Sequence, residues 1–164
     1  NKEGWHPFIK CLDKSNLPSE KMIGDFSALE DVIMVGYPTG LVDAVNNFPI
    51  VRRGITSTPY TKNYQDKQEF LADIPVYGGS SGSPIFVMNE GSWLTSSGLV
   101  MGGTRFALIG VLYAGHTETM NGQIVAEPVP TGLAPVAKVT HIINLGLCIK
   151  SALIEDLAAQ IPDW

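Results

Sequence analysis

The chain has 164 residues, of which 45% are hydrophobic and 16% are charged, and its formal net charge is −5. A high apolar fraction with a small net charge excludes an intrinsically disordered chain, and a single domain of this length can bury a sizeable core. With 11 Lys and Arg residues against 16 Asp and Glu, no basic surface for nucleic acid is expected. No apolar run is long enough to cross a membrane. We therefore expect neither nucleic acid nor a membrane as a partner.

The chain begins at Asn1 rather than Met and shows no signal peptide. We therefore expect it to be a processed or excised part of a longer protein. Its two cysteines, Cys11 and Cys148, have no His or Cys beside them, so the local sequence contains no zinc-binding pattern. We interpret them as isolated free thiols, with a single disulfide as the alternative.

Short apolar and β-branched runs, separated by Gly, Pro and Asn residues, predict a mainly β chain. In chain order, strands are expected at Asp31–Tyr37, Pro49–Thr58, Glu69–Ile74, Ser83–Met88, Phe106–Ala114, Leu133–Val139 and Gly146–Lys150. The fourth run is followed by Asn89-Glu90-Gly91, which we interpret as a turn. Short strands separated by turns are typical of a sandwich or barrel.

A helical period occurs in one segment, residues 151–161, where one face is formed by Leu153, Ile154, Leu157 and Ile161. Ser151 is placed to cap the N-terminus of this helix, and Pro162 ends it. We expect the helix to pack on the last strand. Residues 1–27 show neither the apolar runs of a strand nor a helical period, and we interpret them as an irregular connector.

The segment Tyr77–Pro84 (YGGSSGSP) has the densest cluster of Gly and Ser in the chain. Such a cluster is usually a flexible surface loop, but this one runs through Pro84 directly into an apolar strand. Its pattern Gly-x-Ser-Gly-x-Pro allows a tight turn that directs the N–H groups of Gly79 and Ser81 at one place. Two backbone donors beside a hydroxyl form an oxyanion hole next to a nucleophile. We therefore expect Ser81 to be a nucleophile and Gly79 to belong to its oxyanion hole.

The same residues also fit Gly-x-Ser-x-Gly, the nucleophile elbow of α/β-hydrolases, with Ser80 as the nucleophile. That elbow needs a strand before it and a helix after it. Because Ile85-Phe86-Val87 predicts a strand after the loop and no βαβ alternation is present, this alternative is not favoured.

Four stretches around the loop follow one another as in trypsin-like serine peptidases. They are Asp31–Gly40 (DVIMVGYPTG), with its Gly-x-Pro-x-Gly ending, Ile50–Ser57 (IVRRGITS), Phe70-Leu71-Ala72-Asp73, and Leu108–Ala114, which resembles the strand that pairs with substrate. From Leu29 to Gly115 the chain therefore resembles the C-terminal part of a bacterial-type serine peptidase with the chymotrypsin fold, a group that includes the high-temperature-requirement proteases.

The resemblance implies an all-β fold, namely the second, six-stranded β-barrel of a double-barrel peptidase with a C-terminal α-helix. The barrel would occupy residues 28–150. A remnant of the first barrel, or a connector from it, would occupy residues 1–27, and the terminal helix residues 151–164.

The resemblance also implies peptide-bond hydrolysis through an acyl-enzyme at Ser81, with no metal or organic cofactor. A polypeptide substrate would pair with Tyr113, Ala114 and Gly115 as an added strand. His116 would lie at the rim of that cleft, or alternatively be a turn residue after the strand. The base of the primary specificity pocket would lie around Pro75. No acidic residue stands there, so a small or apolar side chain is favoured over Lys or Arg.

A catalytic Ser needs a base and an orienting acid, and in this family both precede it in the chain. His6 is the only His before Ser81, and Asp25 and Asp31 are the acids that could accompany it. However, His6 lacks the strands that should precede a catalytic His, and the match to the family makes Asp31 structural. We therefore expect the base and the acid upstream of Asn1.

Two alternatives to a peptidase remain open. One is a non-catalytic module that binds an extended peptide or a partner protein in the same cleft. The other is a stable core that is inactive until it pairs with an N-terminal fragment, in which case an exposed apolar face should make the isolated chain associate.

Two polar features near the motif are interpreted as structural. Arg52 and Arg53 are neighbours in a strand and point to opposite faces, which favours a solvated pair. Asp73 is expected to brace the loop before Ser81 by accepting hydrogen bonds from backbone N–H groups.

Overall fold

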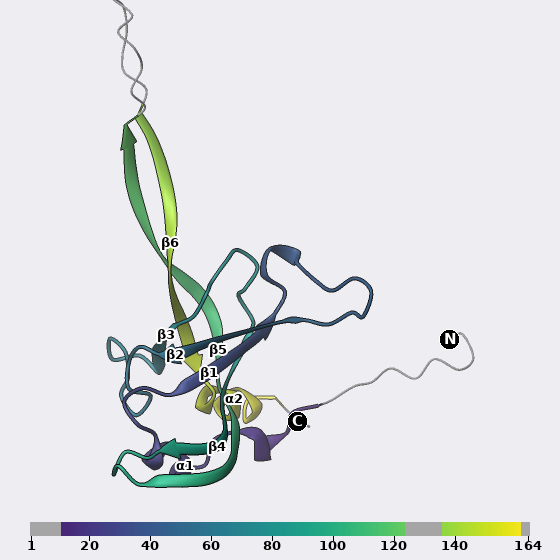
Figure 1. Ribbon diagram of the computed structural model, residues 1–164, viewed down its shortest axis with the longest axis vertical. Helices are drawn as coiled ribbons and strands as arrows, with labels where there is room; N and C mark the ends of the chain where they lie inside the picture. Colours follow the sequence, from purple (N-terminus) through teal and green to yellow (C-terminus); the bar gives the residue numbers. More distant parts are fainter. Residues whose placement is uncertain (1–10, 124–135, 162–164) are drawn as a thin grey trace, which may run out of the picture.

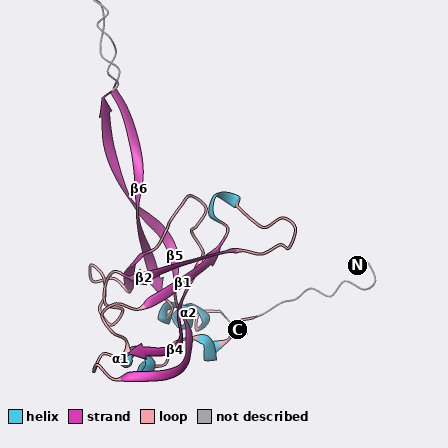
Figure 2. Cartoon of the chain, in the orientation of Figure 1, coloured by secondary structure: helices cyan, strands magenta, loops and turns pink. Residues whose placement is uncertain are grey.

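The computed structural model describes residues 11–123 and 136–161, with side chains at 11–117 and 143–161. Six strands form one antiparallel sheet that closes into a ring in the order β1-β2-β3-β6-β5-β4 (Figure 1). The strands are β1 (Asp31–Gly36), β2 (Ile50–Thr56), β3 (Glu69–Asp73), β4 (Pro84–Leu94), β5 (Val100–Gln123) and β6 (Val136–Lys150). The prediction of a mainly β chain is confirmed, as Figure 2 shows.

The core fills the inside of this ring. Alternate residues of β1 and β3 point inward, as the period of two in a strand requires. The ring closes where Val32–Met34 of β1 pairs with Ile85–Val87 of β4. The largest fully buried side chains are those of Phe70, Met34, Ile74, Ile85, Ile109, Leu112, Val32 and Val87.

Strands β4, β5 and β6 are longer than the sequence predicts. Asn89-Glu90-Gly91 is not a turn, because it lies within β4 and pairs with β5. The turn comes later, where the N–H of Thr95 donates to the carbonyl of Leu99 at 2.9 Å. Two separate strands are expected at 133–139 and 146–150, of which residues 133–135 lie outside the described residues. The described residues of both belong to one strand, β6, which forms a ribbon with β5 that projects from the ring (Figure 1).

The expectation of an irregular N-terminal connector is wrong for its described part, residues 11–27. This part contains a 3-10 turn, η1 (Lys14–Asn16), and a short helix, α1 (Glu20–Asp25). Asp13 caps η1, and the Ser19 hydroxyl accepts the N–H of Met22 at the start of α1. Helix α1 has too few residues for a helical period to be recognised. A second 3-10 turn, η2 (Pro38–Gly40), follows β1.

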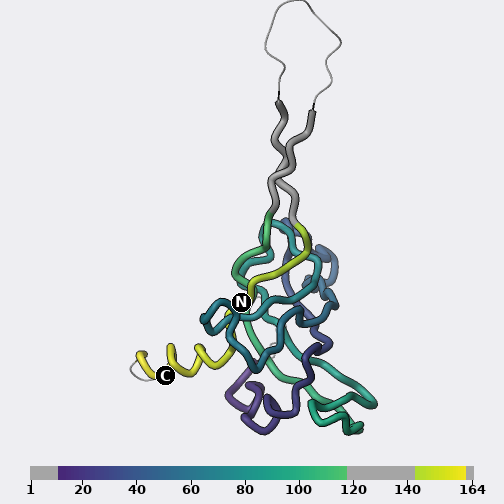
Figure 3. The backbone as a smooth tube through the Cα atoms, turned by 90° about the vertical axis from the view of Figure 1, so that its left-hand side faces the viewer, coloured from purple at the N-terminus to yellow at the C-terminus, as the bar shows by residue number. Residues whose placement is uncertain are grey.

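The C-terminal helix, α2 (Ala152–Ala158), is shorter than predicted and none of its residues is fully buried. Leu157 and Ile161 are 59% and 41% exposed, so the expected packing is wrong for this half of the apolar face, whereas Leu153 and Ile154 are half-buried. Ser151 occupies the cap position, but its side chain makes no capping bond and lies beside the Tyr60 hydroxyl instead. Figure 3 shows α2 extending sideways from the ring.

Within the described ranges, no helix has both the length and the apolar character that a membrane crossing requires.

Candidate functional site

The loop that carries the Ser and Gly cluster joins β3 to β4. We call residues 74–83 the Ser81 loop. Its first half is anchored in the core by Ile74 and Val76, which are both buried. The N–H of Ile74 also donates to the carbonyl of Asn144 on β6. The last residue, Ser83, is buried again, whereas the middle of the loop is exposed. The loop is therefore fixed at both ends and presents its centre to solvent.

Two glycines give the Ser81 loop its shape. Gly79 has φ +81° and Gly82 has φ +88°, a region that side chains with a Cβ rarely adopt. A Cβ on Gly79 would also lie 3.3 Å from the backbone nitrogen of Thr39. The N–H of Ser80 donates to the Tyr77 carbonyl at 3.0 Å. This geometry agrees with the tight turn that the motif predicts.

Ser81 lies exposed at the centre of the loop, against β5. Its Oγ donates a hydrogen bond to the carbonyl of Tyr113 at 3.0 Å. Directly after Ser81, the N–H of Gly82 donates to the carbonyl of Leu112 at 2.7 Å, and the N–H of Leu112 donates to the carbonyl of Ser83 at 2.9 Å. The structure therefore brings together Ser81 and the segment that the sequence predicts for substrate binding.

The backbone N–H groups of Gly79 and Ser81 are the expected oxyanion-hole donors. Within the part of the chain that the structure describes, neither donates a hydrogen bond to a protein acceptor. Both stand on the exposed part of the loop. Both N–H groups can therefore donate to an acceptor from outside the described part of the chain.

The predicted substrate segment, residues 113–116, lies in β5 where its pairing with β6 is irregular. The register shifts between Leu112 and Ala114 and again between Gly115 and Thr117, so Tyr113 and His116 are bulge residues. His116 is exposed and lies inside the strand, so its interpretation as a turn residue is wrong. The Tyr113 hydroxyl donates to the Glu69 carboxylate at 3.1 Å, and desolvation together with this bond raises the pKa of the Tyr113 phenol.

Pro75, the expected base of a specificity pocket, is half-buried. The next residue, Val76, is buried, and a Cβ on Gly146 would lie 3.3 Å from one of its methyl groups. Pro75 and Val76 are themselves apolar, and neither is acidic.

Two residues that contact the inner side of the Ser81 loop, Arg52 and Ser80, are not predicted to do so from the sequence. Arg52 is not a solvated residue: its Nη1 donates to the carbonyl of Pro75 at 2.7 Å and to the hydroxyl of Ser80 at 3.1 Å. The same Ser80 hydroxyl accepts the N–H of Tyr77 at 3.2 Å. Ser80 has no exposed surface. Through these hydrogen bonds, Arg52 and Ser80 anchor the buried side of the Ser81 loop.

The signal for Arg52 was present in the period of two along β2. Arg52 lies on the same face as Gly54 and the buried Thr56, whereas Val51 and Arg53 point outward. The expectation that the two arginines face opposite ways is thus confirmed. The apolar residues of β2, however, do not indicate which of its two faces points inward.

Three other residues that the sequence singles out are Asp31, Asp73 and His6. The structure does not place the first two beside Ser81, and the third lies outside the described residues. Asp31 begins β1 and pairs with Arg53 at 3.2 Å, whereas it is Gly36, at the far end of β1, that lies against Ser83. Asp73 is exposed and its carboxylate accepts no described hydrogen bond, so the prediction that it braces the loop is wrong.

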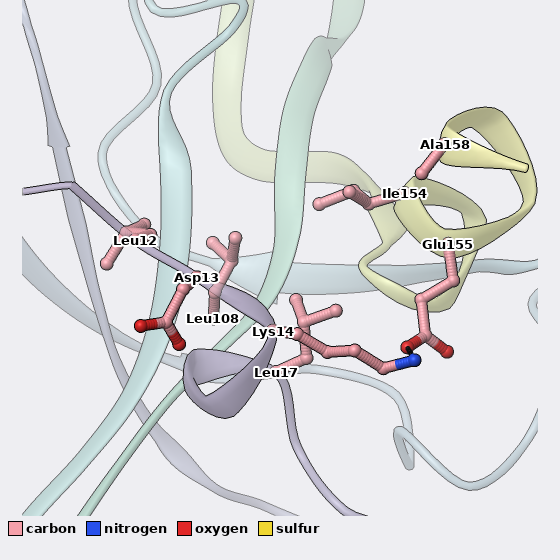
Figure 4. A pocket seen from close by; sticks show the side chains of 8 residues that line it. All are labelled: Leu12, Asp13, Lys14, Leu17, Leu108, Ile154, Glu155 and Ala158. Carbon is pink, nitrogen blue, oxygen red and sulfur yellow. Dashed lines mark ion pairs between the residues drawn. The ribbon is translucent and has the colours of Figure 1, made fainter. Parts of the chain in front are cut away.

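Other features of the molecule lie apart from this loop. Both cysteines are free, as predicted, and burial raises the pKa of the Cys148 thiol to about 12. Among the described residues, no cluster of His, Cys, Asp and Glu could hold a metal ion. A groove between η1 and α2 is drawn in Figure 4, where the ion pair between Lys14 and Glu155 crosses it at 3.0 Å.

Comparison with family models, with curated proteins and with solved structures gives no match for this chain.

Proposed function

We propose that this chain is the nucleophile-bearing barrel of a chymotrypsin-type serine peptidase, which hydrolyses peptide bonds through an acyl-enzyme at Ser81. The observation that carries the proposal is the Ser81 loop itself. An exposed hydroxyl stands between two glycines of positive φ, beside two backbone N–H groups without a protein acceptor. The six-stranded closed sheet around it supports the same proposal.

The proposed reaction uses the groups of this loop in a definite order. The Ser81 hydroxyl first gives up its bond to the Tyr113 carbonyl, because its proton must go to a base. Its oxygen then attacks the carbonyl carbon of the substrate, and the developing oxyanion accepts hydrogen bonds from Gly79 and Ser81. One such donor contributes roughly 100- to 1000-fold to the rate. The amine leaves with the proton, and water then releases the acyl group from Ser81.

The base and the acid of this reaction are proposed to lie upstream of Asn1. The substrate is proposed to be an extended polypeptide that pairs with β5 at Ala114 and Gly115, next to Ser81. We propose that a small or apolar side chain precedes the scissile bond rather than Lys or Arg, because no acidic residue stands at Pro75 or Val76 and the cation of Arg52 donates to the Pro75 carbonyl.

One observation favours a second candidate, a non-catalytic module that binds an extended peptide in the same place. In the described part of the chain, Ser81 is hydrogen-bonded to a backbone carbonyl and to no histidine. A hydroxyl without a base is a weak nucleophile.

Labelling with a fluorophosphonate, followed by peptide mapping, tests the proposal. This reagent modifies an activated serine and not merely an exposed one. It should be applied to the protein together with whatever its gene encodes before Asn1, with Ser81→Ala as the control. Modification at Ser81 that disappears in the control is the expected result. Modification at Ser80 would instead support the α/β-hydrolase motif.

The binding module is supported by a different outcome. It would be indicated if no serine were modified and the encoded upstream segment had no His and Asp ahead of strand-like runs.

A further inference from the structure

Arg52 joins two points of the Ser81 loop, Pro75 and Ser80, that lie on either side of Gly78 and Gly79. One nitrogen of its guanidinium donates both to the carbonyl of Pro75 and to the hydroxyl of Ser80. Ser80 also accepts the N–H of Tyr77, so two hydrogen bonds meet at its buried hydroxyl and a third joins Arg52 to the Pro75 carbonyl. A rotation of the segment Tyr77–Ser80 would therefore break at least one of these three hydrogen bonds.

The surroundings of Arg52 differ from those of Arg105, the other arginine with little exposure. Arg105 is paired with the Glu30 carboxylate and donates to Asn89 at 2.8 Å. Arg52 has no carboxylate beside it, and its buried Nε and Nη2 have no acceptor among the described residues. Placing a charge there is costly, and burial lowers the pKa of the Arg52 guanidinium. Every hydrogen bond that it makes within the described residues goes to the Ser81 loop.

We propose that Arg52 is a positioning residue for the reaction at Ser81. The N–H of Ser81 belongs to the peptide unit whose carbonyl, that of Ser80, accepts the N–H of Ser83 at 3.1 Å. Arg52 holds the side chain of Ser80, so it limits the movement of the residue from which this peptide unit starts. Arg52 acts through Ser80 and Pro75 and does not itself touch the substrate. This inference rests on the proposed function in its catalytic part, while the anchoring of the loop can be measured separately.

The test compares Arg52→Met, which removes the charge and the donors, with Arg52→Lys, which keeps a cation on a shorter stem. Arg53→Met is the matched control, because Arg53 neighbours Arg52 on the same strand but is exposed and pairs with Asp31. Two quantities are measured on each variant. One is fluorophosphonate labelling, separated into the maximal rate and the half-saturating reagent concentration. The other is hydrogen exchange, by NMR, at the bonded amides of Ser80, Gly82 and Ser83.

We expect Arg52→Met to lower the maximal labelling rate roughly 10- to 100-fold, with less than about a twofold change in half-saturating concentration. The three amides should exchange at least about tenfold faster, because the loop opens locally. Arg52→Lys should recover part of both losses, and Arg53→Met should match the unaltered protein. A general loss of stability would not produce this separation of rate from binding, nor the rescue by Lys.

Unchanged exchange in Arg52→Met would overturn the proposal, and so would a change confined to the half-saturating concentration. If Arg52→Met does not fold, the same comparison is made between Arg52→Lys and Arg53→Lys. If the unaltered protein is not labelled at all, the proposed function fails. The exchange rates then still decide whether Arg52 anchors the loop.

Discussion

Ser80 and Ser81 are adjacent, chemically identical residues with opposite surroundings. Ser80 has no exposed surface and its hydroxyl accepts two hydrogen bonds from within the protein. Ser81 is exposed and its hydroxyl makes one bond, to a carbonyl. A nucleophile must reach its substrate, so the burial of Ser80 argues against the α/β-hydrolase alternative. The positive φ of the flanking Gly79 and Gly82 produces this difference.

Alanine substitutions should separate the two serines. Ser80→Ala removes the acceptor of the Tyr77 N–H and one of the two acceptors of Arg52 Nη1, so it should lower the free energy of unfolding by about 1–3 kcal/mol. Ser81→Ala removes one exposed bond and should change that free energy by less than about 0.5 kcal/mol. Urea denaturation measures both. Equal losses in the two variants would contradict the assignment of Ser80 as the buried anchor.

The sequence predicts part of this site and misses part of it for a physical reason. The spacing of Gly and Ser is enough to predict the tight turn, because only glycine readily adopts positive φ. The contribution of Arg52 depends on which face of β2 points inward. The apolar residues Val51 and Ile55 suggest the wrong face, since both are partly exposed in the structure.

At the scale of elements, the pairing of β2 with β3 depends on one glycine, Gly54. These two strands share only the pairs Ile55–Asp73 and Thr56–Ala72. Just before them, a Cβ on Gly54 would lie 2.1 Å from the backbone oxygen of Asp73 and 2.8 Å from the Cβ of Ile74. Because Asp73 and Ile74 lead into the Ser81 loop, the close approach at Gly54 also determines where that loop begins.

Gly54→Ala should therefore destabilise the chain by more than about 3 kcal/mol, because backbone atoms must move to make room. Gly24→Ala is the matched control. Gly24 lies in α1 with nothing within 4 Å of an added Cβ, and Ala in a helix is favoured over Gly by about 0.5–1 kcal/mol. Thermal unfolding should show one variant less stable and the other slightly more stable than the unaltered chain. A Gly54→Ala variant as stable as Gly24→Ala would show that β2 and β3 do not approach each other so closely.

The elements themselves were predicted best where the chain alternates and ends in a clear turn, as at β1 and β3. The long ribbon of β4 and β5 is not predicted well, because Asn89-Glu90-Gly91 has the composition of a turn. In the structure, Gly91 and Gly103 stand opposite each other and both have positive φ. Gly91 therefore belongs to an irregular part of the β4–β5 pair and not to a turn. The actual turn, at Thr95–Leu99, is not predicted from the sequence.

On the whole molecule, the ring encloses its own core but leaves an apolar surface beside α2. The groove between η1 and α2 has an apolar part, formed by Leu12, Leu17, Leu108, Ile154 and Ala158, and a charged part, formed by Asp13, Lys14 and Glu155. On the same helix, Leu157 and Ile161 are well exposed. Contiguous apolar surface of this kind usually marks a place where another protein surface packs. We therefore expect the isolated chain to associate with itself.

Sedimentation over a range of concentrations measures this association. Leu157→Lys should shift the chain towards monomer, because a charge on the exposed apolar face of α2 must be desolvated when two surfaces meet. Gln160→Lys adds the same charge at an exposed polar position of the segment that follows α2, so it should leave the association unchanged. If both variants weaken association equally, long-range repulsion between charges is responsible and the apolar face is not the contact. If the unaltered chain is monomeric at high concentration, the surface beside α2 does not drive self-association.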